Sequence, residues 1–286
     1  MIILSIHCFP HELSELNRLI SLLNSNISNV EKESFKFLLH ISLNLNKAII
    51  DYTDNEIQAS VNEFHKICDT SQIKTKKEVN DKENFLGVNE HRRKTISISR
   101  SEDFIMFLDC DIYFNEYLLN EMVNQCSKLR RFVEYLVITA STPKLWDNTW
   151  NCLVNNDFKN EELNQYKKIS KSIVNNYKGS TIKPIPTFKW AGGWANLISA
   201  SLLKLIGIPK SFKGYGPDDT FIMECCKILK RKSIKVQQYV LKDFLVIENY
   251  DLKSSIKFKK NVPNFREESE RHFNDELINF YKKYKN

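Results

Sequence analysis

An apolar run of five residues, from Phe104 to Leu108, ends directly at the tripeptide Asp109-Cys110-Asp111. A run this apolar predicts a strand buried on both faces, as in the parallel sheets of α/β folds. Carboxylates that follow such a strand lie at the carboxyl edge of the sheet, where open α/β folds bind ligands. Residues i and i+2 of an extended chain point the same way, so both carboxylates can reach one hard cation. The tripeptide therefore predicts either a Mg²⁺ or Mn²⁺ site for a diphosphate or a strand-end turn, where Asp is also common.

Strands and helices are expected to alternate along the chain. We predict strands at 2–7, 35–45, 104–108, 132–140 and 234–246, and helices at 13–23, 57–68, 115–129, 165–176, 199–206 and 274–284. The polar, lysine-rich segment 71–84 is expected to be a surface loop or the start of a helix. This alternation predicts a three-layer α/β domain around a largely parallel sheet.

Composition narrows the class of protein further. We find no repeat and no obvious linker in the 286 residues, so we expect a single domain over 1–286. No run of 18 apolar residues occurs, which argues against a membrane span. The seven cysteines lack metal-like spacing and no secretory signal is apparent. We therefore expect a cytoplasmic protein with free thiols.

The net charge of +7 is unevenly distributed. Residues 226–286 contain 15 lysines and arginines against 8 aspartates and glutamates, so the rest of the chain is neutral. Such a basic segment indicates either a surface that faces phosphate groups or simply a solvated, lysine-rich face.

A second acidic motif follows a glycine-rich turn, in the sequence Gly-Tyr-Gly-Pro-Asp-Asp at 214–219. Asp218 and Asp219 are expected at a helix N-terminus, where a single Asp would already serve as a cap. Shortly before it, Trp190 and Trp194 flank a Gly-Gly pair that includes Gly193. Two aromatic faces with close backbone approach suit a sugar ring, although tryptophans also pack in protein cores.

The order of these motifs resembles that of metal-dependent glycosyltransferases that use nucleotide-diphospho-sugars. These have the GT-A fold, and the likeness is to family 2 and to the galactosyltransferase-like group. It extends over about residues 1–250 and rests on an early Ile-x-x-Ser-Ile strand, His91-Arg92-Arg93, Asp109-x-Asp111, Trp190-Ala-Gly-Gly-Trp194 and the 214–219 segment. The last reads Gly-Trp-Gly-Gly-Glu-Asp in the galactosyltransferase-like group, so this chain departs from that pattern at three positions.

The resemblance implies a fold and a reaction. The fold would be a three-layer, Rossmann-like domain with a mostly parallel, mixed central sheet. Its donor-nucleotide half would span about 1–115, its acceptor half about 116–250, and a basic C-terminal extension 251–286. The reaction would be a metal-dependent and inverting transfer of a sugar from a UDP-sugar to a hydroxyl group.

The resemblance also implies roles for individual residues. Asp219 would be the catalytic base, and the metal, Mn²⁺ or Mg²⁺, would be held by Asp109 and Asp111. The other roles would be acceptor binding by Asp218, Trp190, Gly193 and Trp194, and donor binding by His7, Phe9, Arg92, Arg93 and Asp109. The segment 143–147 is a further candidate for lining the site, on its position alone.

The third metal ligand is a departure from the resemblance. Related enzymes usually supply a His after the catalytic acid, but no His lies between Asp219 and His272. Glu248, Asn249, His272 or water would fill this position.

The acceptor and the class of protein stay open at this stage. The acceptor would be a glycan, a lipid-linked sugar, a protein or a hydroxymethylated base in DNA, as in phage-type enzymes. The alternatives are a non-catalytic module that binds nucleotide-sugars or glycans, and a nucleotidyltransferase or nuclease that uses two carboxylates to hold its metal.

Overall fold

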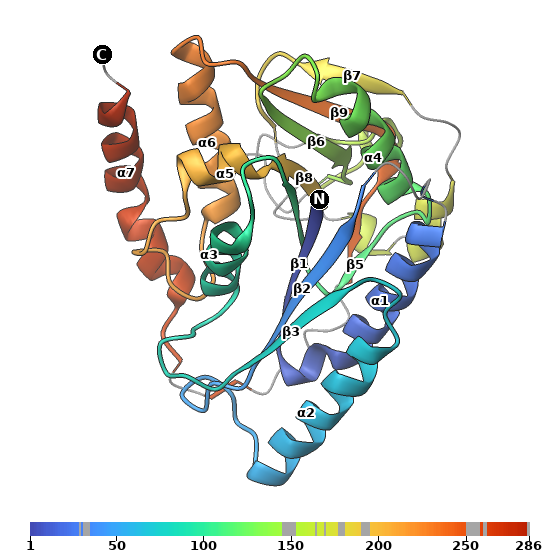
Figure 1. Ribbon diagram of the computed structural model, residues 1–286, viewed down its shortest axis with the longest axis vertical. Coiled ribbons are helices and arrows are strands. Elements are labelled where there is room, and N and C mark those ends of the chain that lie inside the picture. The colour runs from blue at the N-terminus through green and yellow to red at the C-terminus, as the bar shows by residue number, and fades with distance from the viewer. Residues whose placement is uncertain are drawn as a thin grey trace.

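The computed structural model describes residues 1–28, 30, 35–144, 153–163, 165–168, 170–176, 181–189, 195–249, 258–259 and 262–284. An eight-stranded sheet with helices on both faces forms the centre of the molecule (Figure 1). In spatial order its strands are β3 (Thr75–Asn80), β2 (Phe37–Asn44), β1 (Ile2–Cys8), β4 (Phe104–Leu108), β8 (Asn196–Ser199), β6 (Tyr135–Ser141), β9 (Val236–Leu245) and β7 (Ile182–Ile185). A second, two-stranded sheet pairs β5 (Ile112–Tyr113) with β10 (Ile247–Glu248).

The sheet is mostly parallel, as predicted. Strands β3, β2, β1 and β4 are parallel neighbours, and so are β6 and β9. Strand β8 runs antiparallel to both β4 and β6, and β7 is antiparallel to β9. The carboxyl ends of β1, β4 and β6 therefore meet at one edge of the sheet, and β8 begins at that same edge.

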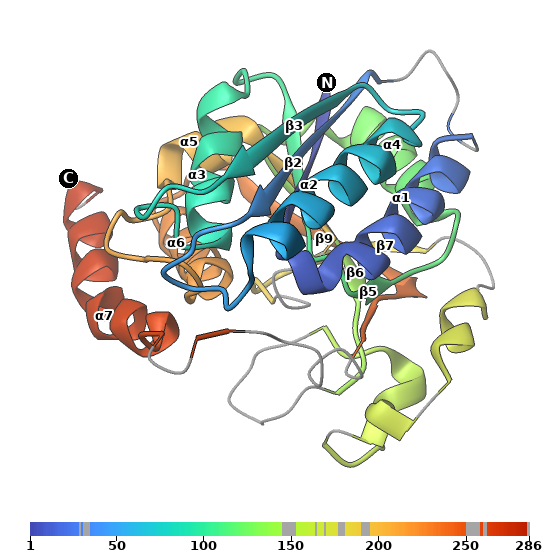
Figure 2. The ribbon, with the colours of Figure 1, turned by 90° about the horizontal axis from the view of Figure 1, so that it is seen from below.

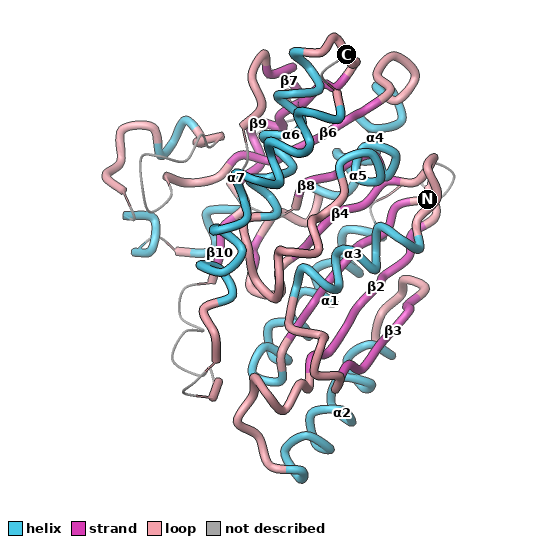
Figure 3. Tube along the Cα trace, turned by 90° about the vertical axis from the view of Figure 1, so that its left-hand side faces the viewer, coloured by secondary structure: helices cyan, strands magenta, loops and turns pink. Residues whose placement is uncertain are grey.

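The helices cover the two faces of the sheet in two groups. One face packs against α1 (Leu13–Ser28), α2 (Asp54–Asp69) and α4 (Leu118–Leu129), and the other against α3 (Val88–Ile98), α5 (Ala200–Ile206) and α6 (Asp218–Arg231). Helix α7 (Phe265–Lys283) packs on α6 at the side of the molecule, as Figures 2 and 3 show. Alternate residues of β1 divide between the two cores, since Leu4 packs in the first and Ile3 in the second.

Most predicted elements are present, and the differences have physical reasons. The polar segment 71–84 contains β3, an edge strand whose lysines lie at the surface, a common arrangement at sheet edges. The helix predicted at 165–176 is instead two short 3-10 helical segments, η3 (Gln165–Lys168) and η4 (Lys171–Asn175). Two further 3-10 turns are η1 (Pro10–Glu12) and η2 (Asn156–Phe158). Helix α7 begins nine residues earlier than predicted, where the Asn264 side chain caps its first turn.

Two sequence expectations concern the cysteines and the membrane. The six cysteines in the described part of the chain are buried free thiols. None of the helices in the described ranges combines the length and the apolarity that crossing a bilayer requires.

Candidate functional site

A cavity of about 610 Å³ opens at the carboxyl ends of β1 and β4. Residues at or just beyond the ends of these two strands line it, among them His7, Phe9 and Asp109. Gly214, Tyr215 and residues close to the C-terminus also line it. The cavity thus lies where an open α/β sheet binds its ligands.

Four carboxylates line this cavity, those of Glu12, Asp109, Asp111 and Glu248. Burial, together with the nearby Asp109 charge, raises the pKa of Asp111 to about 7. Burial likewise raises the pKa of Glu12 to about 8. Burial is the larger cause of both shifts, and a cation bound here would favour the ionised forms of these carboxyls. Their oxygen atoms are the ligands that Mg²⁺ and Mn²⁺ prefer, so the site fits such a metal.

The backbone around the Asp109-Cys110-Asp111 tripeptide is fixed from two sides. Arg18 on α1 donates to the carbonyl oxygens of Cys110, at 3.1 Å, and Ile112, at 2.7 Å. On the other side, the N–H of Asn249 donates to the carbonyl oxygen of Asp111 at 2.7 Å. The pairing of β5 with β10 places Glu248 opposite Ile112 and so brings it to the cavity.

The three candidates for a third metal ligand lie in different surroundings. Glu248 lines the cavity together with Asp109 and Asp111. The Asn249 carboxamide is bound to Lys171 and to Glu15. His272 is exposed on α7 and does not line the cavity. Within the described ranges, no group of three His, Cys, Asp or Glu side chains is close enough to hold a metal without rearrangement.

Arg92 lies between the two acidic motifs. It is a buried residue of α3, and its Nη1 donates to Asp218 Oδ2 at 2.8 Å while its Nη2 donates to Asp109 Oδ1 at 3.1 Å. Its guanidinium also lies over the Phe107 ring, 5.0 Å from the centroid. These contacts place Arg92 behind the cavity wall, and it is not among the cavity-lining residues.

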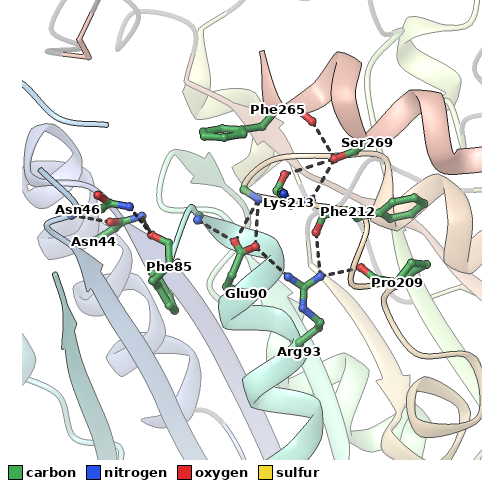
Figure 4. A network of polar contacts seen from close by, with 12 residues as sticks. Asn44, Asn46, Phe85, Glu90, Arg93, Pro209, Phe212, Lys213, Phe265 and Ser269 are labelled. Carbon is green, nitrogen blue, oxygen red and sulfur yellow. Dashed lines mark hydrogen bonds and ion pairs between the residues drawn. The ribbon is translucent and has the colours of Figure 1, made fainter. Parts of the chain in front are cut away.

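Arg93, the other arginine predicted to bind the donor, is not among the cavity-lining residues. Its Nη1 donates to the carbonyl oxygens of Pro209 and Phe212, each at 2.8 Å, and its Nη2 to Glu90 at 2.8 Å. Figure 4 shows this network. Arg93 therefore fixes the loop before α6, which leads to Asp219.

A close backbone contact holds the 214–219 turn against α3. A Cβ atom on Gly87 would lie 2.9 Å from the Gly214 carbonyl oxygen, which accepts a bond from the Asn89 N–H. The Glu90 carboxylate accepts from the N–H groups of both glycines. Gly214 also has a φ of 58°, in the left-handed region that favours glycine.

The two aspartates at the start of α6 differ in their surroundings. Asp218 is 2% exposed and is bound to Arg92. Asp219 is partly exposed and accepts a bond from the Thr220 N–H at 2.7 Å. Burial and the neighbouring Asp218 raise the pKa of Asp219 to about 6. A carboxylate with this pKa is suited to accept a proton near neutral pH.

His7 and Phe9 line the cavity at the end of β1. Their rings meet edge to face at 4.9 Å, and His7 also stacks on Phe85 at 6.1 Å. His7 is nine-tenths buried, and its Nε2 has no hydrogen-bond partner among the described residues. Burial lowers the pKa of His7 to about 3, so the ring is neutral. This end of the cavity thus offers aromatic faces and one open polar atom.

Several predicted residues are not placed at this cavity. Trp190, Gly193 and Trp194 lie outside the described residues, as do positions 145–147. Pro143 and Lys144 are described and do not line the cavity.

One part of the cavity wall was missed by sequence reasoning. Phe258, Lys259 and residues 262–266 line the cavity, although they belong to the segment beyond the region of resemblance. The basic composition of 226–286 and the amphipathic terminal helix were the available signals, but neither indicates where the segment packs.

No family model and no curated protein sequence matches this chain. Among solved structures, the chain is similar to GalNAc-T7 crystallised with UDP, GalNAc and Mn²⁺, with a TM-score of 0.57 and 13% identity over 100% of this chain. The chain covers 50% of the length of that GalNAc-T7 chain. UDP-glucose pyrophosphorylase complexed with UDP-glucose aligns with 9% identity over 99% of this chain and 98% of its own. Its TM-score of 0.42 is too low to indicate a shared fold.

At this identity the likeness to GalNAc-T7 shows the fold alone. The chain has a GT-A glycosyltransferase fold, which confirms the fold that the sequence resemblance implied.

Proposed function

We propose that this protein transfers a sugar from a nucleoside diphosphate sugar, with UDP as the first candidate nucleotide, to a hydroxyl group of an acceptor. The observation that carries the proposal is the shared cavity of His7, Phe9, Asp109, Asp111 and Glu248 at the carboxyl edge of a GT-A sheet. Its volume of about 610 Å³ lies in the range of cofactor and substrate sites.

The donor would occupy the cavity along its length. The base would lie against His7 and Phe9, where the open Nε2 accepts a hydrogen bond from an N–H group of the base. The diphosphate would lie beside Asp109 and Asp111, with Glu248 as the third carboxylate. A Mn²⁺ or Mg²⁺ ion bound there would stabilise the negative charge of the diphosphate leaving group.

Asp219 would remove the proton from the acceptor hydroxyl as the oxygen of that hydroxyl attacks the anomeric carbon of the sugar. Its raised pKa supports this role, because it keeps the group basic enough to take a proton and still ionised at neutral pH. A single base that assists direct displacement gives inversion at the anomeric carbon. Asp218, paired with Arg92, would position the start of α6 rather than bind the acceptor.

The test is a donor screen by thermal shift and calorimetry with Mn²⁺, followed by transfer assays. UDP, GDP and ADP sugars are offered with simple saccharides and with DNA that contains hydroxymethylcytosine. Metal-dependent binding of one nucleotide sugar, and its turnover with an acceptor, would support the proposal.

Each alternative predicts a different result. Binding of donor without turnover on any acceptor indicates a binding module. Turnover of a nucleoside triphosphate without a sugar donor indicates a nucleotidyltransferase. Activity on saccharides alone excludes the modified base in DNA as the acceptor.

A further inference from the structure

Two described parts of the chain beyond residue 250, 258–259 and 262–266, line the cavity, and each is attached to a different part of the molecule. In the first, Phe258 forms an isolated bridge with Ile50, and the N–H of Lys259 donates to the carbonyl oxygen of Ile49 at 2.9 Å. The Phe258 ring also meets the ring of Phe9 at 5.1 Å. This part is thus joined to the loop after β2 and to the aromatic end of the cavity.

The other part is held by α7, which packs on the turn that carries Asp219. A Cβ atom on Gly214 would lie 2.8 Å from the Phe265 ring, and one on Gly216 would lie 2.7 Å from the Ser269 side chain. Ser269 Oγ also accepts from the N–H of Lys213 at 3.2 Å, as Figure 4 shows. Without side chains on these glycines, α7 approaches the turn closely enough for its first residues to line the cavity.

This segment brings positive charge to an acidic cavity. Lys259 and Arg266 line it, whereas the two arginines of α3 do not. Arg92 is bound to Asp109 and Asp218, and Arg93 to Glu90 and two backbone carbonyls. Arg266 Nε pairs with Glu270 on its own helix, an exposed pair that adds little to stability.

We propose that Lys259 and Arg266 bind the diphosphate of the nucleotide donor, in the cavity that they line together with Asp109 and Asp111. This inference rests on the proposed function and assigns to the C-terminal segment the role that the sequence assigned to Arg92 and Arg93. A cation on the carboxylates and the two cationic side chains would then together neutralise the charge of the diphosphate.

The test compares Arg266→Gln and Lys259→Gln with Arg271→Gln, an exposed arginine of α7 that does not line the cavity. Calorimetry with Mn²⁺ measures the Kd of UDP, GDP, inorganic pyrophosphate and uridine. In each cavity variant, the Kd of the diphosphate that binds the wild-type protein should rise by about tenfold or more. This is the loss expected for one charge-assisted contact. Uridine affinity and the melting temperature should not change, and Arg266→Lys should restore part of the binding.

The outcomes separate this inference from the proposed function. If the wild-type protein binds no nucleoside diphosphate, both fail. If it binds one, and Arg266→Gln and Lys259→Gln bind it as tightly as Arg271→Gln does, the assignment of the C-terminal segment fails alone. Equal weakening of UDP and uridine also overturns it, because the effect would not depend on the phosphates.

Discussion

Arg92 and Asp218 form an ion pair in which both side chains are buried, with 2.8 Å between Nη1 and Oδ2 and exposures of 6% and 3%. The same guanidinium reaches Asp109 at 3.1 Å. One arginine on α3 therefore links the end of β4 to the start of α6. The two acidic motifs, more than a hundred residues apart in sequence, are held in one arrangement by this side chain.

Removing the Arg92 charge should destabilise the protein strongly. Arg92→Met leaves Asp218 buried without its partner, and breaking a buried pair costs about 3–5 kcal/mol. Urea denaturation measures the loss, with Arg131→Gln, an exposed arginine, as the control. Arg92→Met combined with Asp218→Asn should recover part of the stability. A loss below about 1 kcal/mol would show that the pair contributes little.

Asp219→Asn should abolish turnover and leave donor binding intact. Loss of a general base lowers kcat by about 10²- to 10⁴-fold, while donor binding should persist because Asp219 is not among the cavity-lining residues. In the wild-type protein, kcat should fall as the pH drops below about 6, because Asp219 then becomes protonated. Steady-state kinetics across pH and calorimetry with the donor check both parts. An unchanged kcat in the variant would remove Asp219 from the reaction.

The metal-free protein should lose stability as the pH rises. The folded-state pKa values of Asp111, about 7, and Glu12, about 8, lie above their ordinary values. The folded state therefore holds protons that the unfolded chain has released, and the free energy of unfolding decreases from about pH 4 to about pH 8. Asp111→Asn should reduce this slope, whereas Asp54→Asn, at an exposed position, should not.

Added Mn²⁺ should raise the melting temperature more at about pH 8 than at about pH 5.5, because the metal binds the ionised carboxylates. Thermal melts with Mn²⁺ and with a chelator measure this difference. An equal shift of the melting temperature at both pH values, or no shift, would contradict the assignment of these carboxylates as metal ligands.

Gly216→Ala should weaken the packing of α7 against the 214–219 turn. The new Cβ would lie 2.7 Å from Ser269, and overpacking of this kind costs about 1–3 kcal/mol. The control is Gly207→Ala, where φ is 73° and no atom lies within 4 Å of the added Cβ, so only backbone strain of about 1–2 kcal/mol is expected. Thermal melts give the stability of both variants. Calorimetry with UDP should show weaker binding for Gly216→Ala alone.

The buried elements of the fold were predictable from local sequence. The run at β4 is buried at all five positions, and the apolar spacing in α1 gives its buried face. Strand β3 was not predictable in the same way, because its lysines and glutamate resemble a loop and only pairing with β2 makes it a strand. The 3-10 helices η3 and η4 were not predictable either, because the local sequence does not distinguish them from one α-helix.

The acidic motifs of the candidate site were predictable from the sequence, but the contacts of its arginines and lysine were not. Asp109 and Asp111 were recognised because their spacing follows from strand geometry, and both line the cavity. Asp219 was singled out by the family resemblance, and its role stays a prediction. The partners of Arg92 were not predictable, because two carboxylates from distant segments bind it. The same holds for Lys259, which is held by the carbonyl oxygen of Ile49, and for Arg266, which follows the close contact of Phe265 with Gly214.

The reversed direction of β8 brings the end of one strand and the start of another to the same edge of the sheet. Strand β4 ends there, directly before Asp109, and β8 begins there. The N–H of Ala195 donates to the carbonyl oxygen of Phe107 at 2.9 Å, so the entry to β8 is held by the strand that carries the first acidic motif. A shift of β4 along its own axis would therefore move the entry to β8 with it, and the two strands keep this edge aligned as one unit.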